Sequence, residues 1–229
     1  MEEHLVRPVA VIVPAYNEAS RIPRVLRAIL DARLPTEVIV VSDGSTDRTA
    51  EVARAIEGVN VIVLPYNMGK GGAMAAGVAA SQARVVAFVD ADLSGLTGAH
   101  VDRIIRPVLD GHCDMCVGIF RGGKVWSDVG HKISPFLSGQ RALRRELFEA
   151  VPYMAELRMG VEIALTKAAK RRKARVRRVV LPGVSNCHKE QKMGLVKGAA
   201  ARVKMYGEIA EASIRTRQRE KHAPRKPWL

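Results

Sequence analysis

The chain has 229 residues, of which 48% are hydrophobic and 26% are charged. This length and composition fit one globular domain with or without a tail, and the lack of an 18-residue apolar run argues against a membrane-spanning helix. The net charge of +14 is concentrated late in the chain: residues 165–229 hold 19 Lys and Arg against 4 Asp and Glu. Such a basic segment attracts phosphorylated substrates, anionic membranes or nucleic acid, unless it is simply a solvated helix.

The first half of the chain alternates apolar strands with amphipathic helices. We expect strands at 9–13, 37–42, 59–64 and 84–89, and helices at 22–32, 47–56, 71–81 and 101–109. The strands are continuous Val and Ile runs, which indicates burial on both faces. Strand–helix alternation with short connections predicts an α/β fold, with a mostly parallel central sheet and helices on both faces.

After Gly111 the pattern becomes less regular. We expect a strand at 113–120, helices at 142–150 and 159–172, a strand at 175–181 and a long basic helix at 195–219. Since no linker between domains stands out, we predict one domain over residues 1–200 and a basic C-terminal helix and tail over 201–229.

The cysteines and the first residues bear on the cellular location. Cys113 and Cys116 form a C-x-x-C pair, with Cys187-His188 far downstream. Three cysteines are too few for a disulfide framework, and residues three apart on a strand point to opposite faces, so we favour buried structural thiols over a zinc site. Residues 1–4 lack the features of a signal peptide, which predicts a cytoplasmic protein, either free or peripheral at the inner membrane face.

Polar clusters follow four of the predicted strands. They are Pro14-Ala15-Tyr16-Asn17-Glu18, Ser42 to Asp47, Asn67 to Gly72, and Asp90-Ala91-Asp92. Taken singly, each can be explained as a helix cap or a tight loop. Because open α/β sheets bind ligands beyond the carboxyl ends of their strands, we expect the four clusters to lie together at one edge of the sheet.

Asp90 and Asp92 flank one small residue directly after a buried strand. Mg²⁺ and Mn²⁺ prefer oxygen ligands, and usually take one or two protein carboxylates together with phosphate oxygens of the substrate. A lysine in a glycine-rich loop, here Lys70, can neutralise a diphosphate, with backbone N–H groups and a helix N-terminus behind it. An aspartate at a neighbouring strand end can bind a base or a ribose. The clusters together predict sites for base, ribose, diphosphate and metal.

The motifs V-P-A-Y-N-E, V-S-D-G-S-T-D, N-x-G-K-G and the D-x-D strand resemble the nucleotide-sugar domain of GT-A glycosyltransferases of the family 2-like group. The likeness covers about residues 8–200 and implies a Rossmann-like GT-A fold. Further stretches resemble glucosyl-3-phosphoglycerate synthases, namely 122–125, 135–140, 144–147, 151–152 and 160–165. Those enzymes are retaining and use a nucleotide-glucose with Mg²⁺ or Mn²⁺. Polyprenyl-phosphate sugar transferases share the N-terminal motifs.

This resemblance implies a role for each matching residue. Nucleotide contacts are implied for Pro14, Ala15, Tyr16, Glu18, Ser42, Asp43, Lys70, Asp90 and Ala91. Metal ligands are implied at Asp92, the main one, at His188, and at Asp90, which is shared with the ribose. The reacting centre is implied to involve Glu162, which grips the donor sugar, together with Asp92, Leu137 and Gly139. Acceptor contacts are implied for Gly123, Lys124, Ser138, Lys189 and Lys192.

The acceptor loop departs from the synthase pattern, with Lys124 in place of an Arg, Trp126 in place of a Thr and Glu190 in place of an Asn. The implied reaction is metal-dependent transfer of a hexose, with glucose favoured, from a nucleoside diphosphate sugar, with UDP favoured, to a hydroxyl or phosphate group of a small phosphorylated or lipid-linked acceptor. Retention of configuration is slightly favoured. The alternative is an inverting polyprenyl-phosphate or lipid-acceptor transferase, in which Glu162 or another carboxylate acts as general base.

Two hypotheses come from other classes. A nucleotidyltransferase would show a glycine-rich signature near the N-terminus, whereas here the first strand ends in Pro-Ala-Tyr-Asn-Glu. A non-catalytic module that binds membranes or nucleic acid through the basic tail would need no carboxylate pair. We expect no nucleic-acid partner, and we place anionic membrane contact at residues 171–178. A homodimer is compatible with the sequence.

Overall fold

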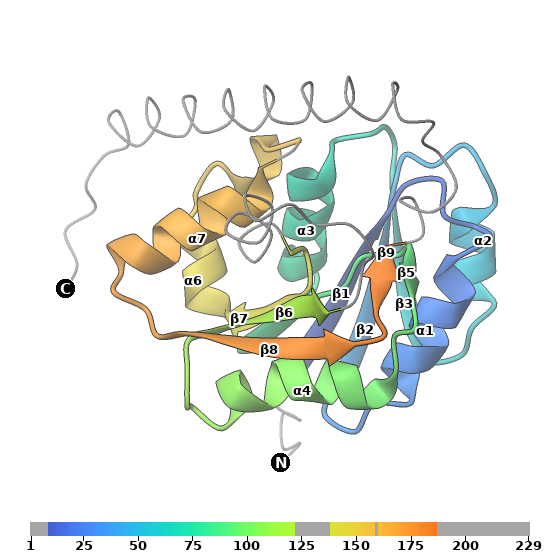
Figure 1. Cartoon of the computed structure of the whole chain (residues 1–229). Coiled ribbons are helices and arrows are strands. Elements are labelled where there is room, and N and C mark those ends of the chain that lie inside the picture. Colours follow the sequence, from blue (N-terminus) through green and yellow to red (C-terminus); the bar gives the residue numbers. More distant parts are fainter. Residues whose placement is uncertain (1–8, 122–137, 159, 187–229) are drawn as a thin grey trace, which may run out of the picture.

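The computed structural model describes residues 9–121, 138–158 and 160–186 (Figure 1). A seven-stranded sheet forms its centre, in the order β3-β2-β1-β4-β7-β6-β8. The strands are β1 (Val9–Ala15), β2 (Glu37–Asp43), β3 (Val59–Leu64), β4 (Val85–Phe88), β6 (Met115–Arg121), β7 (Arg141–Arg144) and β8 (Val176–Pro182). Only β7 runs antiparallel to its neighbours, so the prediction of a mostly parallel sheet is confirmed.

Helices cover both faces of this sheet (Figure 1). They are α1 (Ile22–Leu30), α2 (Thr49–Arg54), α3 (Lys70–Ala79), α4 (Gly98–Leu109), α6 (Arg145–Glu149) and α7 (Val161–Arg171), with a 3₁₀ turn η2 (Met154–Glu156). One core packs α1, α2 and α4 against one face, and a second core packs α3, α6 and α7 against the other. Neighbouring residues of β1, such as Val11 and Ile12, belong to different cores, which explains the unbroken apolar run.

Helix α3 lies close to the sheet because its residues are small. A Cβ atom at Gly77 would stand 2.5 Å from Cγ2 of Ile12 and 3.2 Å from Cγ2 of Val41. Only glycine permits so close an approach of helix and strand. The run of Gly and Ala in this helix therefore sets the height of α3, and of Lys70 at its start, above the strands.

The predicted helix over residues 142–150 is half wrong. Residues 141–144 form β7, and α6 takes only 145–149. Ala142 and Leu143 are fully buried between β4 and β6, so pairing within the sheet outweighs their helical propensity. Two other helices begin two residues later than predicted. The helix predicted at 47–56 begins at Thr49, and the helix predicted at 159–172 begins at Val161.

Cys113 and Cys116 are buried and unbridged. Burial raises the pKa of both thiols, that of Cys116 to about 12 with the neighbouring Cys113 adding to the effect. Both are therefore protonated at neutral pH, as expected for structural thiols. The other candidate zinc ligands, Cys187 and His188, lie outside the described residues, as do the predicted helix at 195–219 and the tail.

A second, two-stranded sheet joins β5 (Leu93–Ser94) to β9 (Ser185–Asn186). Leu93 pairs with Asn186, so the last described residues return to the carboxyl end of β4. Across the described ranges, no helix is long and apolar enough to cross a membrane.

Candidate functional site

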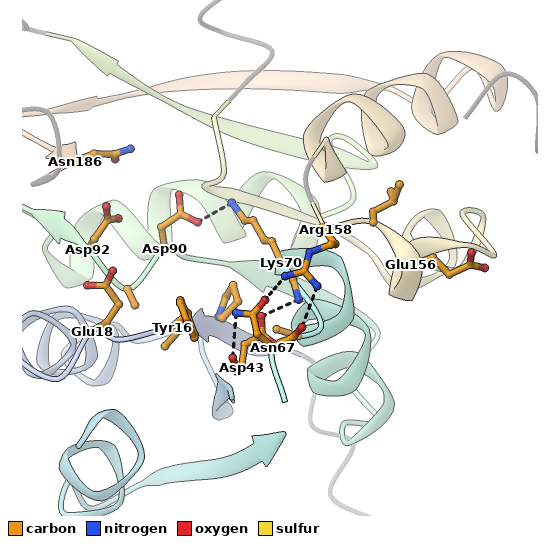
Figure 2. Close-up of a pocket in the computed structure, with 16 residues that line it drawn as sticks. Tyr16, Glu18, Asp43, Asn67, Lys70, Asp90, Asp92, Glu156, Arg158 and Asn186 are labelled. Carbon is orange, nitrogen blue, oxygen red and sulfur yellow. Dashed lines mark hydrogen bonds and ion pairs between the residues drawn. The ribbon is translucent and has the colours of Figure 1, made fainter. Parts of the chain in front are cut away.

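The strands β1 to β4 end at one cleft of about 740 Å³ (Figure 2). It gathers nine of the residues that the sequence singled out: Pro14, Ala15, Tyr16, Glu18, Asp43, Lys70, Asp90, Ala91 and Asp92. Four strand-end clusters therefore meet at one edge of the sheet, as predicted. The volume falls within the range of pockets that bind small molecules and cofactors.

The loops after β1 and β2 are tied together at one side of the cleft. Asn17 adopts a left-handed conformation, with φ of 56°, and its side-chain oxygen accepts a hydrogen bond of 2.8 Å from the N–H of Thr46. The N–H of Glu18 donates to the hydroxyl of Thr49 at 2.8 Å. Directly before these anchors, Tyr16 is 48% exposed and lines the cleft, where its ring is available to a planar ligand.

Asp43 shapes the loop between β3 and α3. Its two carboxylate oxygens accept hydrogen bonds from the N–H groups of Met68, at 2.7 Å, and Gly69, at 2.9 Å. Asn67 donates to the Asp43 carbonyl and accepts from Arg158 through both its carbonyl and its side-chain oxygen, at 3.0 and 2.6 Å (Figure 2). Arg158 thus clamps this loop and lines the cleft, a role that the sequence analysis missed.

The N-terminus of α3 is closed by the segment that precedes α7. The N–H of Lys70 donates to the carbonyl of Arg158 at 3.2 Å, and that of Gly71 to the carbonyl of Leu157 at 2.8 Å. A Cβ at Gly71 would stand 2.2 Å from the carbonyl oxygen of Met154, so glycine is needed there. Two of the N–H groups at the start of α3 therefore already donate to backbone carbonyls, and contact of this helix end with a diphosphate stays a prediction.

The side chain of Lys70 joins two carboxylates. Its Nζ lies 2.8 Å from Oδ1 of Asp90 and 2.7 Å from Oε1 of Glu162. Burial opposes ionisation of Lys70 and of Glu162, but opposite charges outweigh it. The carboxylates of Asp90 and Glu162 raise the pKa of Lys70, and the cations Lys70 and Arg141 lower the pKa of Glu162 to about 2. Both groups are therefore charged at neutral pH.

Arg141, at the start of β7, completes what we call the four-charge cluster: Lys70, Asp90, Arg141 and Glu162. Its side chain is 1% exposed and donates to the carbonyl oxygens of Ser138 and Glu162. The sequence analysis missed Arg141, since an arginine in a short strand is ordinarily exposed.

Residues 138–140 support this cluster from the side of β7. Gln140 donates to the second carboxylate oxygen of Asp90 at 2.7 Å, and the Ser138 hydroxyl donates to the Gly118 carbonyl. A Cβ at Gly139 would stand 2.4 Å from Oδ2 of Asp90 and 2.7 Å from Nζ of Lys70. Gly139 is thus packed directly against the ion pair, next to the predicted reacting centre.

The structure leaves some predicted residues away from the cleft surface. Ser42 is buried, and its hydroxyl contacts that of Ser45 at 3.0 Å. Glu162 lies behind Lys70 with a side chain 15% exposed, and it is not among the cleft-lining residues. The predicted sites that fall outside the described residues are Gly123, Lys124, Leu137, His188, Lys189 and Lys192.

Two oxygen-bearing side chains that could contribute to a metal site lie at the side of the cleft near the end of β4 and at β9. Asp92 and Asn186 both line it, and the Asn186 side-chain oxygen is buried with no hydrogen-bond partner among the described residues. Carboxylate and amide oxygens suit a hard divalent cation. Within the described ranges, however, no group of three or more His, Cys, Asp and Glu side chains is placed to hold a metal ion. A cation here would need further ligands, as Mg²⁺ commonly takes from substrate phosphates.

Comparison with known proteins adds a family. Residues 10–165 match the model described as Glycosyl transferase family 2. A dolichyl-phosphate beta-glucosyltransferase of Trichomonas vaginalis is 40% identical over 97 residues, which cover 37% of this chain and 30% of that protein. A 4,4'-diaponeurosporenoate glycosyltransferase of Staphylococcus aureus is 38% identical over 104 residues, 44% of this chain and 28% of that protein. The match thus spans under a third of these relatives.

Solved structures of glucosyl-3-phosphoglycerate synthase from Mycobacterium tuberculosis are similar over most of the chain. The complex with Mn²⁺, UDP and glucosyl-3-phosphoglycerate has a TM-score of 0.70 and 26% identity, and the match covers 90% of this chain and 79% of that one. The complex with Mn²⁺ and UDP-glucose has a TM-score of 0.69 and 26% identity, covering 90% and 78%. The predicted GT-A-like fold is therefore confirmed.

Proposed function

The chain belongs to glycosyl transferase family 2, and on that premise we propose that it transfers a hexose, with glucose favoured, from a UDP-sugar to a small phosphorylated or lipid-linked acceptor. One observation carries this proposal. The four strand-end clusters of the sequence line a single cleft, in a fold that resembles structures holding UDP-glucose and Mn²⁺. Family membership also argues against a nucleotidyltransferase and against a non-catalytic binding module.

For the donor, we propose that Tyr16 and Asp43 meet the base and the ribose, as the resemblance implies, whereas buried Ser42, also implied there, supports the loop through Ser45. Tyr16 offers its exposed ring, and Asp43 holds the loop that carries Lys70. Lys70 supplies the positive charge that faces the diphosphate, since the N–H groups of Lys70 and Gly71 already donate to backbone carbonyls. Binding of the diphosphate would then draw Lys70 partly away from Asp90 and Glu162.

For the metal, we propose Mg²⁺ or Mn²⁺ held by Asp92, with Asp90 and His188 as further ligands. Both oxygens of Asp90 already accept hydrogen bonds, from Lys70 and Gln140, which supports Asp92 as the main ligand. His188 follows Asn186 by two residues in the sequence, and Asn186 lines the cleft. When bound, such an ion acts as a Lewis acid that offsets charge on the leaving diphosphate.

For the stereochemistry, we propose retention of configuration with Glu162 orienting the donor sugar. Arg141 stays beside Glu162 when Lys70 turns toward the diphosphate and continues to lower the pKa of its carboxyl, which makes Glu162 a poor base for the acceptor proton. This argues against the inverting alternative in which Glu162 is the general base. NMR of the product anomer tests the proposal, since a product of opposite configuration to the donor would contradict it.

The acceptor residues proposed from the resemblance are Gly123, Lys124, Ser138, Lys189 and Lys192. A peripheral membrane contact through residues 171–178 is a separate proposal, supported by exposed Arg171, Arg172, Lys173, Arg175, Arg177 and Arg178. Most of this stretch lies before or at the amino end of β8, whereas the cleft lies at the carboxyl ends of the strands, about 20 Å away along a seven-residue strand. Co-sedimentation with liposomes tests it, and equal binding with and without anionic lipid would contradict it.

The substitution Asp92→Asn tests the enzymatic proposal. Turnover of UDP-glucose in the presence of Mn²⁺ should fall by at least about a hundredfold, because a neutral amide binds the cation more weakly. Circular dichroism should show an unchanged fold. Asp110→Asn, at the exposed end of α4 and away from the cleft, serves as control and should retain activity. Full activity of Asp92→Asn would refute the metal assignment.

A further inference from the structure

Arg141 has the largest fully buried side chain among the described residues. It lies in the middle of the sheet, with Phe88 of β4 on one side and Val117 of β6 on the other. Removing a guanidinium from water is costly unless hydrogen bonds and opposite charges compensate. Two carbonyl oxygens, those of Ser138 and Glu162, accept its hydrogen bonds, but carbonyls do not balance its charge.

The balancing charges come from the four-charge cluster. The carboxylates of Glu162 and Asp90 both act electrostatically on Arg141, and the same two carboxylates pair directly with Lys70. Two cations therefore face two anions, and the cluster is neutral overall. Arg141 does not line the cleft, so it acts on a ligand through the charge of the cluster and not through direct contact.

We propose that Arg141 is a positioning residue that keeps the floor of the cleft electrically neutral, so that a divalent cation and a nucleoside diphosphate bind together. Without it, the cluster would carry one net negative charge beneath a cleft that also contains Asp92. Such a charge attracts a free cation and repels a diphosphate.

This inference rests on the proposed function, namely that the cleft binds a nucleoside diphosphate with a metal. The test replaces Arg141 in the full chain by a neutral side chain of similar length, Arg141→Met. Binding of Mn²⁺ without nucleotide is followed by electron paramagnetic resonance, and binding of UDP without metal by calorimetry, both at one low ionic strength. We expect affinity for Mn²⁺ to rise about tenfold and affinity for UDP to fall about tenfold.

If Arg141 served only packing, its replacement would loosen the site and weaken the binding of both Mn²⁺ and UDP. Arg141→Lys keeps the charge and should bring both affinities back toward those of the unaltered chain. Changes in the same direction for both ligands, or no change in either, would overturn the proposal.

The opposite substitution provides a second arm that does not depend on Arg141→Met folding. Glu162→Gln removes a negative charge from the same cluster and should weaken Mn²⁺ binding and tighten UDP binding. The double variant Arg141→Met with Glu162→Gln is neutral again, and both affinities should return to within about threefold of their original values. Circular dichroism checks that each variant is folded.

The two proposals fail in different ways. If the unaltered chain binds no UDP even with Mn²⁺, the proposed function fails and the charge-balance inference fails with it. If the unaltered chain binds UDP with Mn²⁺ but Glu162→Gln does not shift the two affinities in opposite directions, only the role of Arg141 is refuted.

Discussion

The protein holds two clusters of charged side chains in opposite surroundings. In the four-charge cluster, the side chains of Lys70 and Glu162 are 27% and 15% exposed. At the other end of the sheet Asp114 pairs with Arg175 at 3.1 Å and with Arg144 at 3.4 Å, and these arginines are 58% and 46% exposed. Water screens the arginines of the second cluster more strongly than the side chains of the first, so similar ion pairs should contribute differently to stability.

The substitution expected to have the largest effect is Lys70→Met. It leaves the carboxylates of Asp90 and Glu162 close together and without their shared cation, which should cost about 3 kcal/mol of unfolding free energy. Turnover of UDP-glucose should fall about 10²–10³-fold, because the charge facing the diphosphate is lost. Urea unfolding measures the loss of stability, and steady-state kinetics measures the loss of turnover. A loss of stability no greater than that for an exposed ion pair would show that the two clusters do not differ in their contribution to stability.

The four-charge cluster should make the stability of the fold depend on pH. The pKa of Glu162 is about 2 in the folded state against an ordinary 4.5, so its ionised form stabilises the fold above about pH 4.5 and this contribution is lost as the pH falls toward 2. The pKa of Lys70 is raised, so its contribution is present below about pH 10.5 and fades as the pH rises above that value.

Thermal unfolding of the unaltered chain and of Glu162→Gln between pH 2 and pH 7 tests this expectation. The free energies of unfolding of the two proteins should differ by on the order of 2–3 kcal/mol at neutral pH, and this difference should shrink toward pH 2. A difference that stays constant with pH would show that ionisation of Glu162 is not its source.

A smaller effect is expected from Gly139→Ala. The new methyl group would stand 2.4 Å from Oδ2 of Asp90 and must push the ion pair aside, at a cost of about 1–3 kcal/mol and about tenfold in activity. Gly111→Ala is the control: with φ of 73° and no atom within 4 Å, it should lose a little stability through backbone strain but keep its activity. Equal activities for both variants would contradict the close packing of Gly139.

The smallest effect belongs to the exposed cluster. Arg175→Gln should shift the unfolding temperature by less than about 2 °C, and high salt should reduce even this shift. Activity should not change, because Asp114 and Arg175 lie outside the cleft. A shift as large as that of Lys70→Met would mean that exposure does not set the weight of these pairs.

The two halves of the sheet were predictable to different degrees. Strands β1 to β4 are continuous apolar runs followed by polar clusters, and parallel topology alone brings those clusters to one edge. Strand β7 has only four residues, none of them β-branched, and its pairing depends on β4 and β6. No local pattern reveals such a strand.

The site shows the same division. Most of the residues that line the cleft were visible as motifs, whereas cleft-lining Arg158 and buried Arg141 were not. Their roles depend on carbonyl and amide partners far away in the sequence, such as Glu162 for Arg141 and Asn67 for Arg158. The sequence around an arginine does not show whether its side chain will be buried or will bond to a distant loop.

The pairing of β5 with β9 has a consequence for the order of assembly during synthesis. Strands β1 to β4 and helices α1 to α4 are complete once residue 109 has left the ribosome, but Leu93 finds its partner only when Asn186 emerges. The loops after β1 and β2 can therefore form early, but the loop that carries Lys70 waits for Arg158, and the side at Asp92 is closed by a still later, long-range contact that is slow to form. A nascent chain halted before β9 would have most of its sheet but an unfinished cleft.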